Sequence, residues 1–265
     1  MKKTIDKKRF GAWAIVTGAS SGIGMEFARQ LGADGLNLVL VARRLPLLED
    51  VGKQLASEFD IQYIAVEADL SEETSIQKIK EATASLDIGL LISNAGTGRP
   101  GKFLSFAEEE LKYILQLNAV SHLSLVHHFG KKLAARRKGG ILLTGAMGAW
   151  GGVPYMANES GTKGYILSLG KSLHEEFKEF GLHVTVLVTS PTDTPVLKKL
   201  GFTKDNMPSK PLTTRQTVKE ALRALSRNRI TVIPGRSYRV INSLMPASLA
   251  RKLIGATMRK INKIN

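Results

Sequence analysis

Short apolar runs rich in β-branched residues alternate along the chain with longer segments of helical periodicity, such as 106–137 and 154–180. Nearly continuous apolar strands are typical of a parallel sheet that is covered on both faces. Strand and helix units that alternate at this length predict a doubly wound sheet. We therefore expect an α/β, Rossmann-like single domain over residues 1–265, with helices on both faces of the sheet. The seven apolar runs are AWAIVTG, LNLVLVAR, QYIAVEAD, IGLLISNAG, GGILLTGA, LHVTVLVTS and RITVIPG.

The last segment, 246–265, predicts a basic amphipathic C-terminal helix. Leu249, Leu253, Ile261 and Ile264 are spaced along one helical face. The first interpretation is that this apolar stripe packs internally or in a subunit interface. The alternative is peripheral contact with an anionic membrane. The basic residues that fall largely elsewhere on the helix are Arg251, Lys252, Arg259 and Lys263.

Positive charge is concentrated in 198–265, which we interpret as a basic region that includes a substrate lid. This region has 16 lysines and arginines against only Asp205 and Glu220, while the whole chain has a net charge of +15. Such asymmetry suggests an anionic small-molecule substrate, a membrane surface or nucleic acid, with a solvated basic surface as the alternative. Nucleic acid is disfavoured because the basic residues lack interleaved aromatic residues and no dedicated binding motif is present.

Composition excludes several classes of protein. The 265 residues include no cysteine, which excludes disulfides and thiolate metal sites, and we predict no metal site. No apolar run reaches the roughly 18 residues of a membrane span. The basic start, MKKTIDKKRF, leads into the first strand rather than into a signal-peptide core. We expect a cytoplasmic protein, with peripheral membrane association as the alternative.

The stretch TGASSGIG, Thr17–Gly24, follows the first predicted strand and opens the first predicted helix. Gly18 allows a tight turn, Gly22 lets the backbone approach a pyrophosphate, and Gly24 permits close packing of helix and strand. The N-terminus of the helix offers free N–H groups to phosphates. The pattern predicts a dinucleotide site, and the other loop residues expected to contact the cofactor are Ser20, Ser21 and Ile23.

The end of the second strand indicates which dinucleotide binds. Enzymes that prefer NAD usually place a carboxylate here, but this chain has Ala42 followed by Arg43 and Arg44. A guanidinium pairs with a 2′-phosphate, which a carboxylate would repel. The sequence therefore predicts NADP(H). The alternative is that both arginines are simply solvated.

Several motifs in order resemble those of the short-chain dehydrogenase/reductase family, over nearly the whole chain. The resemblance implies an oxidoreductase that forms a dimer or tetramer. It assigns an adenine contact to Asp69 and Leu70 in ADL, and a water-supporting role in proton relay to Asn118. The segment SGTKGYILSLGKSLHEEF resembles the one that carries the family's catalytic lysine, here Lys163, which also binds cofactor. The fourth-strand motif NAG comprises Asn94, Ala95 and Gly96.

The chain departs from the family pattern at the groups that touch the reacting oxygen. The family's tyrosine, four residues before the lysine, is replaced by Glu159, and its serine is replaced by Ala146. Thr144 lies two positions from Ala146. In VTSPTDTP, Thr189 and Ser190 replace the usual Pro-Gly pair, whereas Pro191 and Thr194 match the family, which implies that Thr194 holds the nicotinamide carboxamide.

Glu159 and Lys163 are spaced as a favourable ion pair on a helix. Beside Lys163 the carboxylate is favoured, so we expect Glu159 to be ionised and a poor acid, although it could act as a base. Losing a positioned acid typically lowers a rate by ~10²–10⁴-fold, so ordinary ketone reduction should be weak. Tyr155 is a candidate substitute, because one helical face could carry it with Glu159 and Lys163, but a pocket-lining role is favoured. His122, His127 and His128 are interpreted as packing or surface residues.

Three hypotheses follow from these residues. The first is an NADP(H)-dependent oxidoreductase with altered proton-transfer residues, acting on a conjugated or thioester substrate; some family members that reduce enoyl thioesters depart from the usual tyrosine and lysine. The second is a catalytically silent NADP(H)-binding pseudoenzyme. The third is a non-redox isomerase or lyase in which Glu159 is the base. The first is preferred.

Overall fold

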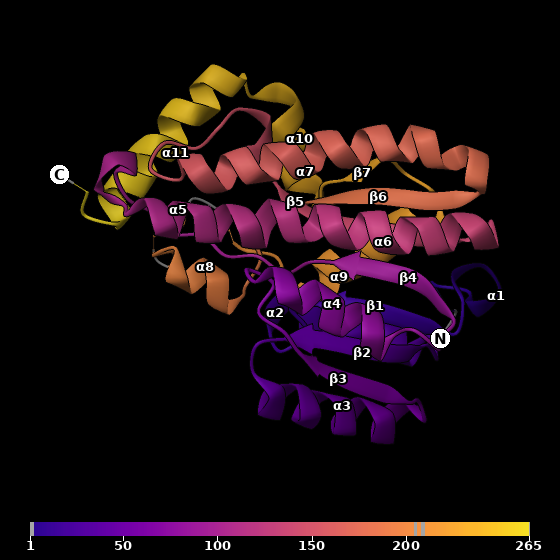
Figure 1. Ribbon diagram of the computed structural model, residues 1–265. Helices are drawn as coiled ribbons and strands as arrows, with labels where there is room; N and C mark the ends of the chain where they lie inside the picture. The colour runs from indigo at the N-terminus through magenta and orange to yellow at the C-terminus, as the bar shows by residue number, and fades with distance from the viewer. Residues whose placement is uncertain (1–2, 204–205, 208–209, 265) are drawn as a thin grey trace.

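The computed structural model describes residues 3–203, 206–207 and 210–264 and contains one seven-stranded parallel sheet, ordered β3-β2-β1-β4-β5-β6-β7 (Figure 1). This arrangement confirms the predicted Rossmann-like α/β fold. The strands are β1 Trp13–Thr17, β2 Asn37–Ala42, β3 Tyr63–Glu67, β4 Ile88–Ser93, β5 Gly139–Ala146, β6 Leu182–Thr189 and β7 Thr231–Val232. The α-helices are α1 Lys7–Phe10, α2 Gly22–Ala33, α3 Leu45–Phe59, α4 Glu73–Ala82, α5 Glu108–Leu115, α6 Ser121–Arg136, α7 Ala157–Glu176, α8 Pro195–Lys199, α9 Thr214–Ser226, α10 Arg236–Leu244 and α11 Ala247–Ile261.

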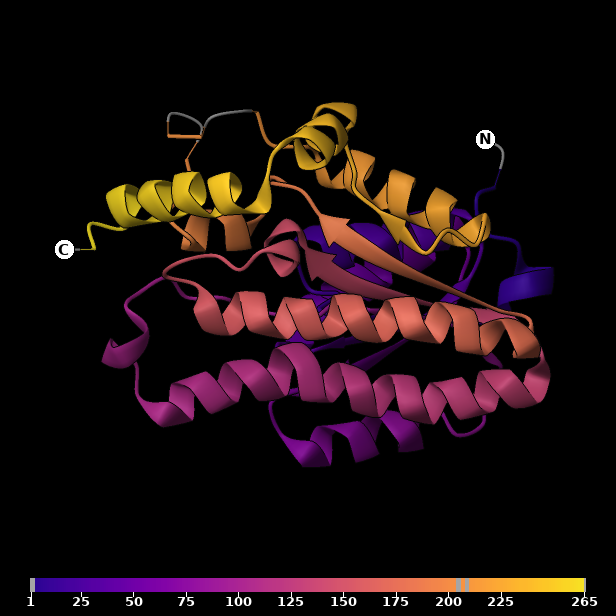
Figure 2. The ribbon, with the colours of Figure 1, turned by 90° about the horizontal axis from the view of Figure 1, so that it is seen from above.

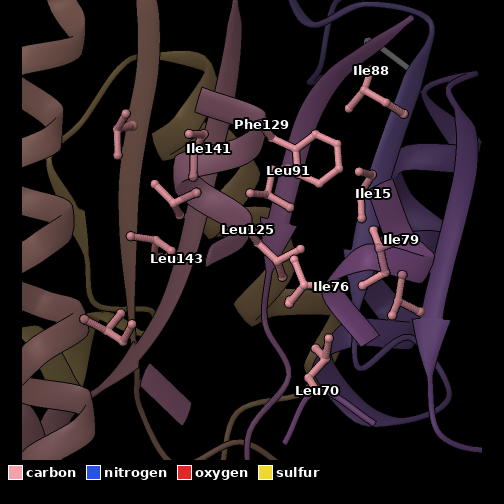
Figure 3. Packing of buried hydrophobic residues seen from close by; sticks show 14 of the residues in the cluster. Ile15, Leu70, Ile76, Ile79, Ile88, Leu91, Leu125, Phe129, Ile141 and Leu143 are labelled. Atoms are coloured by element: carbon pink, nitrogen blue, oxygen red, sulfur yellow. The ribbon is translucent and has the colours of Figure 1, made fainter. Parts of the chain in front are cut away.

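The central strands are apolar throughout because helices cover both of their faces. Successive residues of a strand point to opposite sides, so Ile15 packs into one core and Val16 into the other. Helices α4, α6 and α7 close the first core, where Leu125 and Phe129 of α6 lie against Leu91 (Figure 3). Helices α2, α3 and α9 close the second core.

The order of the strands determines where a ligand can bind. The chain runs outward from β1 to β3 and then returns to β4 on the other side of β1. In open α/β sheets the crevice at such a reversal, beyond the carboxyl ends of the strands, is where ligands bind. The residues that follow β1, β4 and β5 therefore converge at one end of the sheet.

The two long segments that were predicted to be helical differ in detail from the helices observed. Segment 106–137 is α5 and α6 joined by one π-helical turn, Gln116–Val120. Segment 154–180 becomes helical only at Ala157, because Tyr155 has a left-handed backbone with φ +64°. The prediction that Tyr155 shares a helical face with Glu159 and Lys163 is therefore wrong.

The C-terminal helix forms as predicted, but a different face of it packs inward. Gly255 and Met258 of α11 are buried, whereas Leu249 and Leu253 are exposed. The internal packing expected for the apolar stripe is therefore not observed for Leu249 and Leu253, whereas Ile261 and Ile264 are half-buried. Within the basic region 198–265, α9 and β7 join the layers of the sheet, while α10 and α11 lie at the edge of the molecule (Figures 1 and 2). Among the described residues, no helix has both the length and the apolar content needed to cross a bilayer.

Candidate active site

The loop after β1 has the geometry of a phosphate-binding turn. Gly18 and Gly22 have φ values of +69° and +57°, a region that favours glycine. A Cβ at Gly24 would overlap the carbonyl oxygen of Gly18, so this close approach of helix and turn also requires glycine. Ser21 is the N-cap of α2, and its hydroxyl makes no capping hydrogen bond. The N–H groups at the start of α2 thus face the crevice and fit a pyrophosphate.

Thr17, at the end of β1, holds this turn to the loop after β4. Its Oγ1 accepts hydrogen bonds from the backbone N–H of Asn94 at 2.8 Å and of Ala95 at 3.0 Å. The side-chain amide of Asn94 donates to the Thr17 carbonyl oxygen at 3.1 Å. Asn94 and Ala95 therefore occupy the predicted place but act here as structural links. The role of Thr17 was missed in the sequence, where a threonine that ends an apolar strand gives no signal of its partners.

Arg43 and Arg44 lie beside the phosphate loop, where the sequence placed them. The guanidinium of Arg43 donates to Tyr113 Oη at 2.8 Å and lies 3.8 Å from the carboxylate of Asp69. Arg44 donates to Ser20 Oγ at 3.4 Å. Tyr113, on α5, is a further site residue that the sequence did not reveal, because its partner is 70 positions away. These contacts hold two exposed cations at the end of β2, where they fit a phosphate.

Asp69 and Leu70, the two residues that the sequence assigns to the adenine, differ in their surroundings. Asp69 accepts hydrogen bonds from the backbone and the hydroxyl of Ser71, at 3.0 and 2.7 Å. Leu70 is buried in the core, so its side chain is part of the packing beneath the site.

Thr194 caps α8 through a 3.3 Å hydrogen bond from the Leu197 N–H. Its side chain lies against Gly22, close to the phosphate loop.

Asn118 is fully buried in the π-helical turn. Its amide donates to the carbonyl oxygen of Thr97 at 2.8 Å, and its Oδ1 accepts from the N–H of Thr97 at 2.9 Å. A further bond of 3.3 Å reaches Thr162 on α7. The side chain therefore ties the loop after β4 to α7, and a role in proton relay stays a prediction.

Lys163 is buried on α7, and its Nζ donates to the carbonyl oxygen of Thr144 at 3.1 Å. Burial lowers the pKa of its ammonium group, and the nearby Glu159 opposes that shift. A Cβ at Gly96 would come within 3.1 Å of both Lys163 Nζ and Asn118 Oδ1. The structure thus brings Gly96, Asn118 and Lys163 together.

Glu159 differs from its predicted state. Burial raises the pKa of its carboxyl group to about 7, against the opposing effects of the Lys163 and Lys199 charges. Its Oε2 is buried without a hydrogen-bond partner in the described part of the chain, and a Cβ at Gly98 would overlap this atom. Desolvation outweighs the charge of Lys163 four residues away, so the carboxyl is only partly ionised near neutral pH, and the expectation that Glu159 is a poor acid stays a prediction.

Hydroxyl groups near Ala146 do not replace the missing serine. Thr144 donates to Asn94 Oδ1 at 3.3 Å, and Thr189 donates to the carbonyl oxygen of Gly145 at 2.9 Å. Ser190 is buried and donates to the carbonyl oxygen of Pro234 at 2.7 Å. Each of the three hydroxyls is engaged with the protein, whereas Oε2 of Glu159 has no hydrogen-bond partner among the described residues.

The contacts of Tyr155 and of the three histidines on α6 are those of packing or surface residues. Tyr155 lines a small cavity of about 30 Å³ between its loop and α5. His122 is buried, with Nε2 2.9 Å from the Ala95 carbonyl oxygen and Nδ1 2.8 Å from Ser93 Oγ. Because a carbonyl only accepts, Nε2 carries the proton, and burial lowers the pKa of the ring to about 3. His127 is exposed and His128 half-buried on α6, as a packing or surface role requires.

Lys199 is a site residue that the sequence did not single out. It ends α8, and its Nζ donates to Thr97 Oγ1 at 3.1 Å. Its charge also acts on the carboxyl of Glu159. The two residues are 40 positions apart, and only the excess of basic residues after position 198 hinted at a cation here.

Comparison with known proteins gives consistent results. The family model described as short chain dehydrogenase matches residues 12–205. A very-long-chain 3-oxoacyl-CoA reductase from Pyricularia oryzae is 33% identical over 184 residues, which is 68% of this chain and 56% of that protein. The chain spans 57% and 58% of two further fungal reductases of the same name. A short-chain dehydrogenase from Sphingobium yanoikuyae in complex with NADPH is 25% identical, with a TM-score of 0.79 and 96% of each chain covered. A 7beta-hydroxysteroid dehydrogenase structure has a TM-score of 0.85 at 23% identity, with 94% of this chain and 98% of that chain covered.

Proposed function

This chain belongs to the short-chain dehydrogenase/reductase family, and we propose that it is an NADP(H)-dependent oxidoreductase that reduces the keto group of an acyl thioester. In this proposal Glu159 replaces the usual tyrosine as the proton donor. The observation that carries the proposal is the carboxyl of Glu159: its Oε2 is buried and has no hydrogen-bond partner among the described residues, and its pKa is raised to about 7.

The residues at the crevice fit NADP(H). The glycine turn and the start of α2 would hold the pyrophosphate, and Arg43 and Arg44 would hold the 2′-phosphate. Lys163 would hold the ribose next to the nicotinamide, a role carried over from the family resemblance. When bound, the reduced cofactor supplies a hydride. A relative that was crystallised with NADPH and has the same fold supports this choice.

Proton transfer falls to Glu159 because the other candidates are absent or engaged. A carboxyl with a pKa of about 7 is partly protonated at neutral pH, and general acids are most effective when their pKa lies near the working pH. In this proposal Glu159 donates its proton to the substrate oxygen as negative charge develops there. The nearby cation of Lys163 stabilises the carboxylate that remains, since it already lowers the pKa of Glu159.

The relatives and the charge of the site support the thioester substrate. The relative from Pyricularia oryzae is named a very-long-chain 3-oxoacyl-CoA reductase. Lys199 ends α8 and reaches Thr97 at the edge of the site. A cation at this edge suits an anionic substrate such as a thioester of coenzyme A.

The test is steady-state oxidation of NADPH with 3-oxoacyl-CoA thioesters of increasing chain length. We expect turnover by the unmodified chain and a loss of ~10²–10⁴-fold in kcat for Glu159→Gln, as for removal of a positioned acid. Glu175→Gln, at an exposed position of the same helix, is the control and should leave turnover unchanged.

A pseudoenzyme is the second candidate, favoured by the loss of both hydroxyls at Ala146 and Glu159 while the cofactor turn keeps its geometry. It predicts tight NADPH binding with no turnover of keto or enoyl thioesters. Conversion of substrate without NADPH oxidation would instead indicate an isomerase or lyase with Glu159 as the base. Either result contradicts the oxidoreductase proposal.

A further inference from the structure

Helices α10 and α11, which follow each other at the edge of the molecule, expose several large apolar side chains. Leu244 is 76% exposed, Leu253 51% and Leu249 47%. Scattered exposed apolar residues are ordinary, but a cluster on consecutive helices marks an interaction surface. We call this cluster the α10–α11 face. Its members are Val240, Ile241, Leu244, Leu249, Leu253 and Ile254.

The inner side of α11 is already fixed to the body of the protein, which leaves the α10–α11 face free. Gly255 packs on Pro154, and Arg251 Nε donates to the carbonyl oxygen of Gly151 at 2.7 Å. At the other end of the helix, Asn262 donates to the carbonyl oxygen of Leu200 at 3.3 Å. With 3.6 residues per turn, Leu249 and Leu253 point away from this inner side.

The charges around the face have one sign. Residues 221–265 contain ten lysines and arginines and no acidic residue. On α11, Lys252 and Lys260 are exposed and flank the leucines. The nearest preceding acid, Glu220, pairs with Arg239 at 2.6 Å and offsets one of these ten charges, which leaves nine.

We propose that the α10–α11 face docks on the surface of an anionic phospholipid bilayer. On α11, Leu249 and Leu253 share one side of the helix and are bordered by lysines, as in a helix that lies in the headgroup region, where apolar groups reach the acyl boundary and cations meet lipid phosphates. A second copy of the same face would bring like charges together, and a nucleic acid would not use the apolar side chains.

Docking by this face has a consequence for the site. Helix α11 covers the loop around Gly151 and Pro154, which leads directly into α7 and Glu159. Docking by the outer side of α11 would therefore hold this loop near the bilayer, with the helix between them. The docking itself is independent of the proposed function, because it depends on the surface alone.

The test is co-sedimentation of the full chain with phosphatidylcholine vesicles, with and without phosphatidylserine. We expect binding only when phosphatidylserine is present. Lys252→Gln with Lys260→Gln should weaken that binding by about 30-fold, since each basic residue near an anionic surface contributes about fivefold. Leu249→Asp with Leu253→Asp should abolish it. Leu47→Asp, at an exposed leucine on the distant helix α3, is the control and should bind normally.

The proposal is overturned if the unmodified chain does not sediment with anionic vesicles, or if the aspartate variants bind as well as the control. A change in oligomeric state on Leu249→Asp with Leu253→Asp would also overturn it, in favour of a protein interface. Circular dichroism verifies that each variant is folded. Turnover of short-chain thioesters without vesicles is measured separately, so failure of docking and failure of the proposed function are distinguishable.

Discussion

The protonation state of Glu159 changes within the pH range of ordinary assays, because the pKa of its carboxyl is about 7. If the protonated form is the acid, kcat for keto reduction should be high below pH 7 and should fall as the pH rises above it. Glu159→Gln should be slow at every pH and should lack this step. The measurement is the pH dependence of kcat at saturating NADPH. A wild-type profile without a change near pH 7 would exclude Glu159 as the proton donor.

The same residue should make the stability of the folded protein depend on pH. Its pKa is raised from 4.5 to about 7 on folding, so burying the ionised form destabilises the protein above pH 7, and this effect disappears as the pH falls towards 4.5. Glu159→Gln should therefore raise the free energy of unfolding above pH 7, by about 3 kcal/mol at most, and change it little near pH 5.

Thermal unfolding of both forms across this pH range checks this prediction. The control Glu175→Gln removes an exposed carboxyl whose pKa is lowered, chiefly by a hydrogen bond from Lys178, so it should not stabilise the protein above pH 7. A wild type that is as stable as Glu159→Gln at pH 8 and above would mean that the carboxyl is not desolvated.

The state of Glu159 could not be obtained from its local sequence. Spacing along a helix reveals Lys163, four residues away, and this neighbour favours the ionised form. The groups that enclose the carboxyl come from other parts of the chain: Gly98 follows β4, and Lys199 ends α8. The identity of the residue was predictable, whereas its desolvation depends on the tertiary fold.

At the scale of elements, sequence predicts best where burial is uniform. The central strands were identified because both of their faces are covered and the runs are mostly apolar, whereas the edge strands β3 and β7 are largely half-buried. The packed face of α11 was not predicted, because its contact with Pro154 is made by Gly255, and a glycine adds nothing to an apolar pattern. The π-helical turn that carries Asn118 also leaves no mark on the periodicity of 106–137.

The end of β2 should determine which dinucleotide binds. Arg43→Ala should weaken NADP(H) binding by about 1–3 kcal/mol, the range for a charge-assisted hydrogen bond, and leave NAD(H) binding nearly unchanged. Tyr113→Phe should have a smaller effect in the same direction, because it removes the 2.8 Å bond that orients Arg43. Calorimetric titration of both cofactors is the measurement.

Arg29→Ala is a control with the same change in net charge. In the unmodified chain the guanidinium of Arg29, on α2, pairs with the carboxylate of Glu58 at 2.5 Å. This substitution should affect neither cofactor. Equal loss of NADP(H) and NAD(H) affinity on Arg43→Ala would mean that Arg43 does not read the 2′-phosphate.

At the scale of the whole molecule, α5 and α6 lie on the side of α7 that is opposite to α10 and α11 (Figure 2). A hollow of about 520 Å³ on helices α5–α7 is lined mainly by apolar side chains. The homo-oligomer implied by the family resemblance stays a prediction, and this hollow is where we expect it to form. Its lining residues are Phe103, Leu115, Ala119, Val120, Leu123, Ala157, Asn158, Gly161, Thr162 and Tyr165.

Placing a charge in this hollow should separate the subunits. Leu123 and Tyr165 are both exposed on neighbouring helices. The double substitution Leu123→Asp with Tyr165→Glu would place two carboxylates without partners in the interface. Light scattering coupled to gel filtration should show an oligomer for the unmodified chain and a monomer for this variant. Leu249→Asp with Leu253→Asp, on the α10–α11 face, should keep the oligomer intact. A monomeric wild type, or an oligomer that survives both charges, would show that α5–α7 is not the subunit interface.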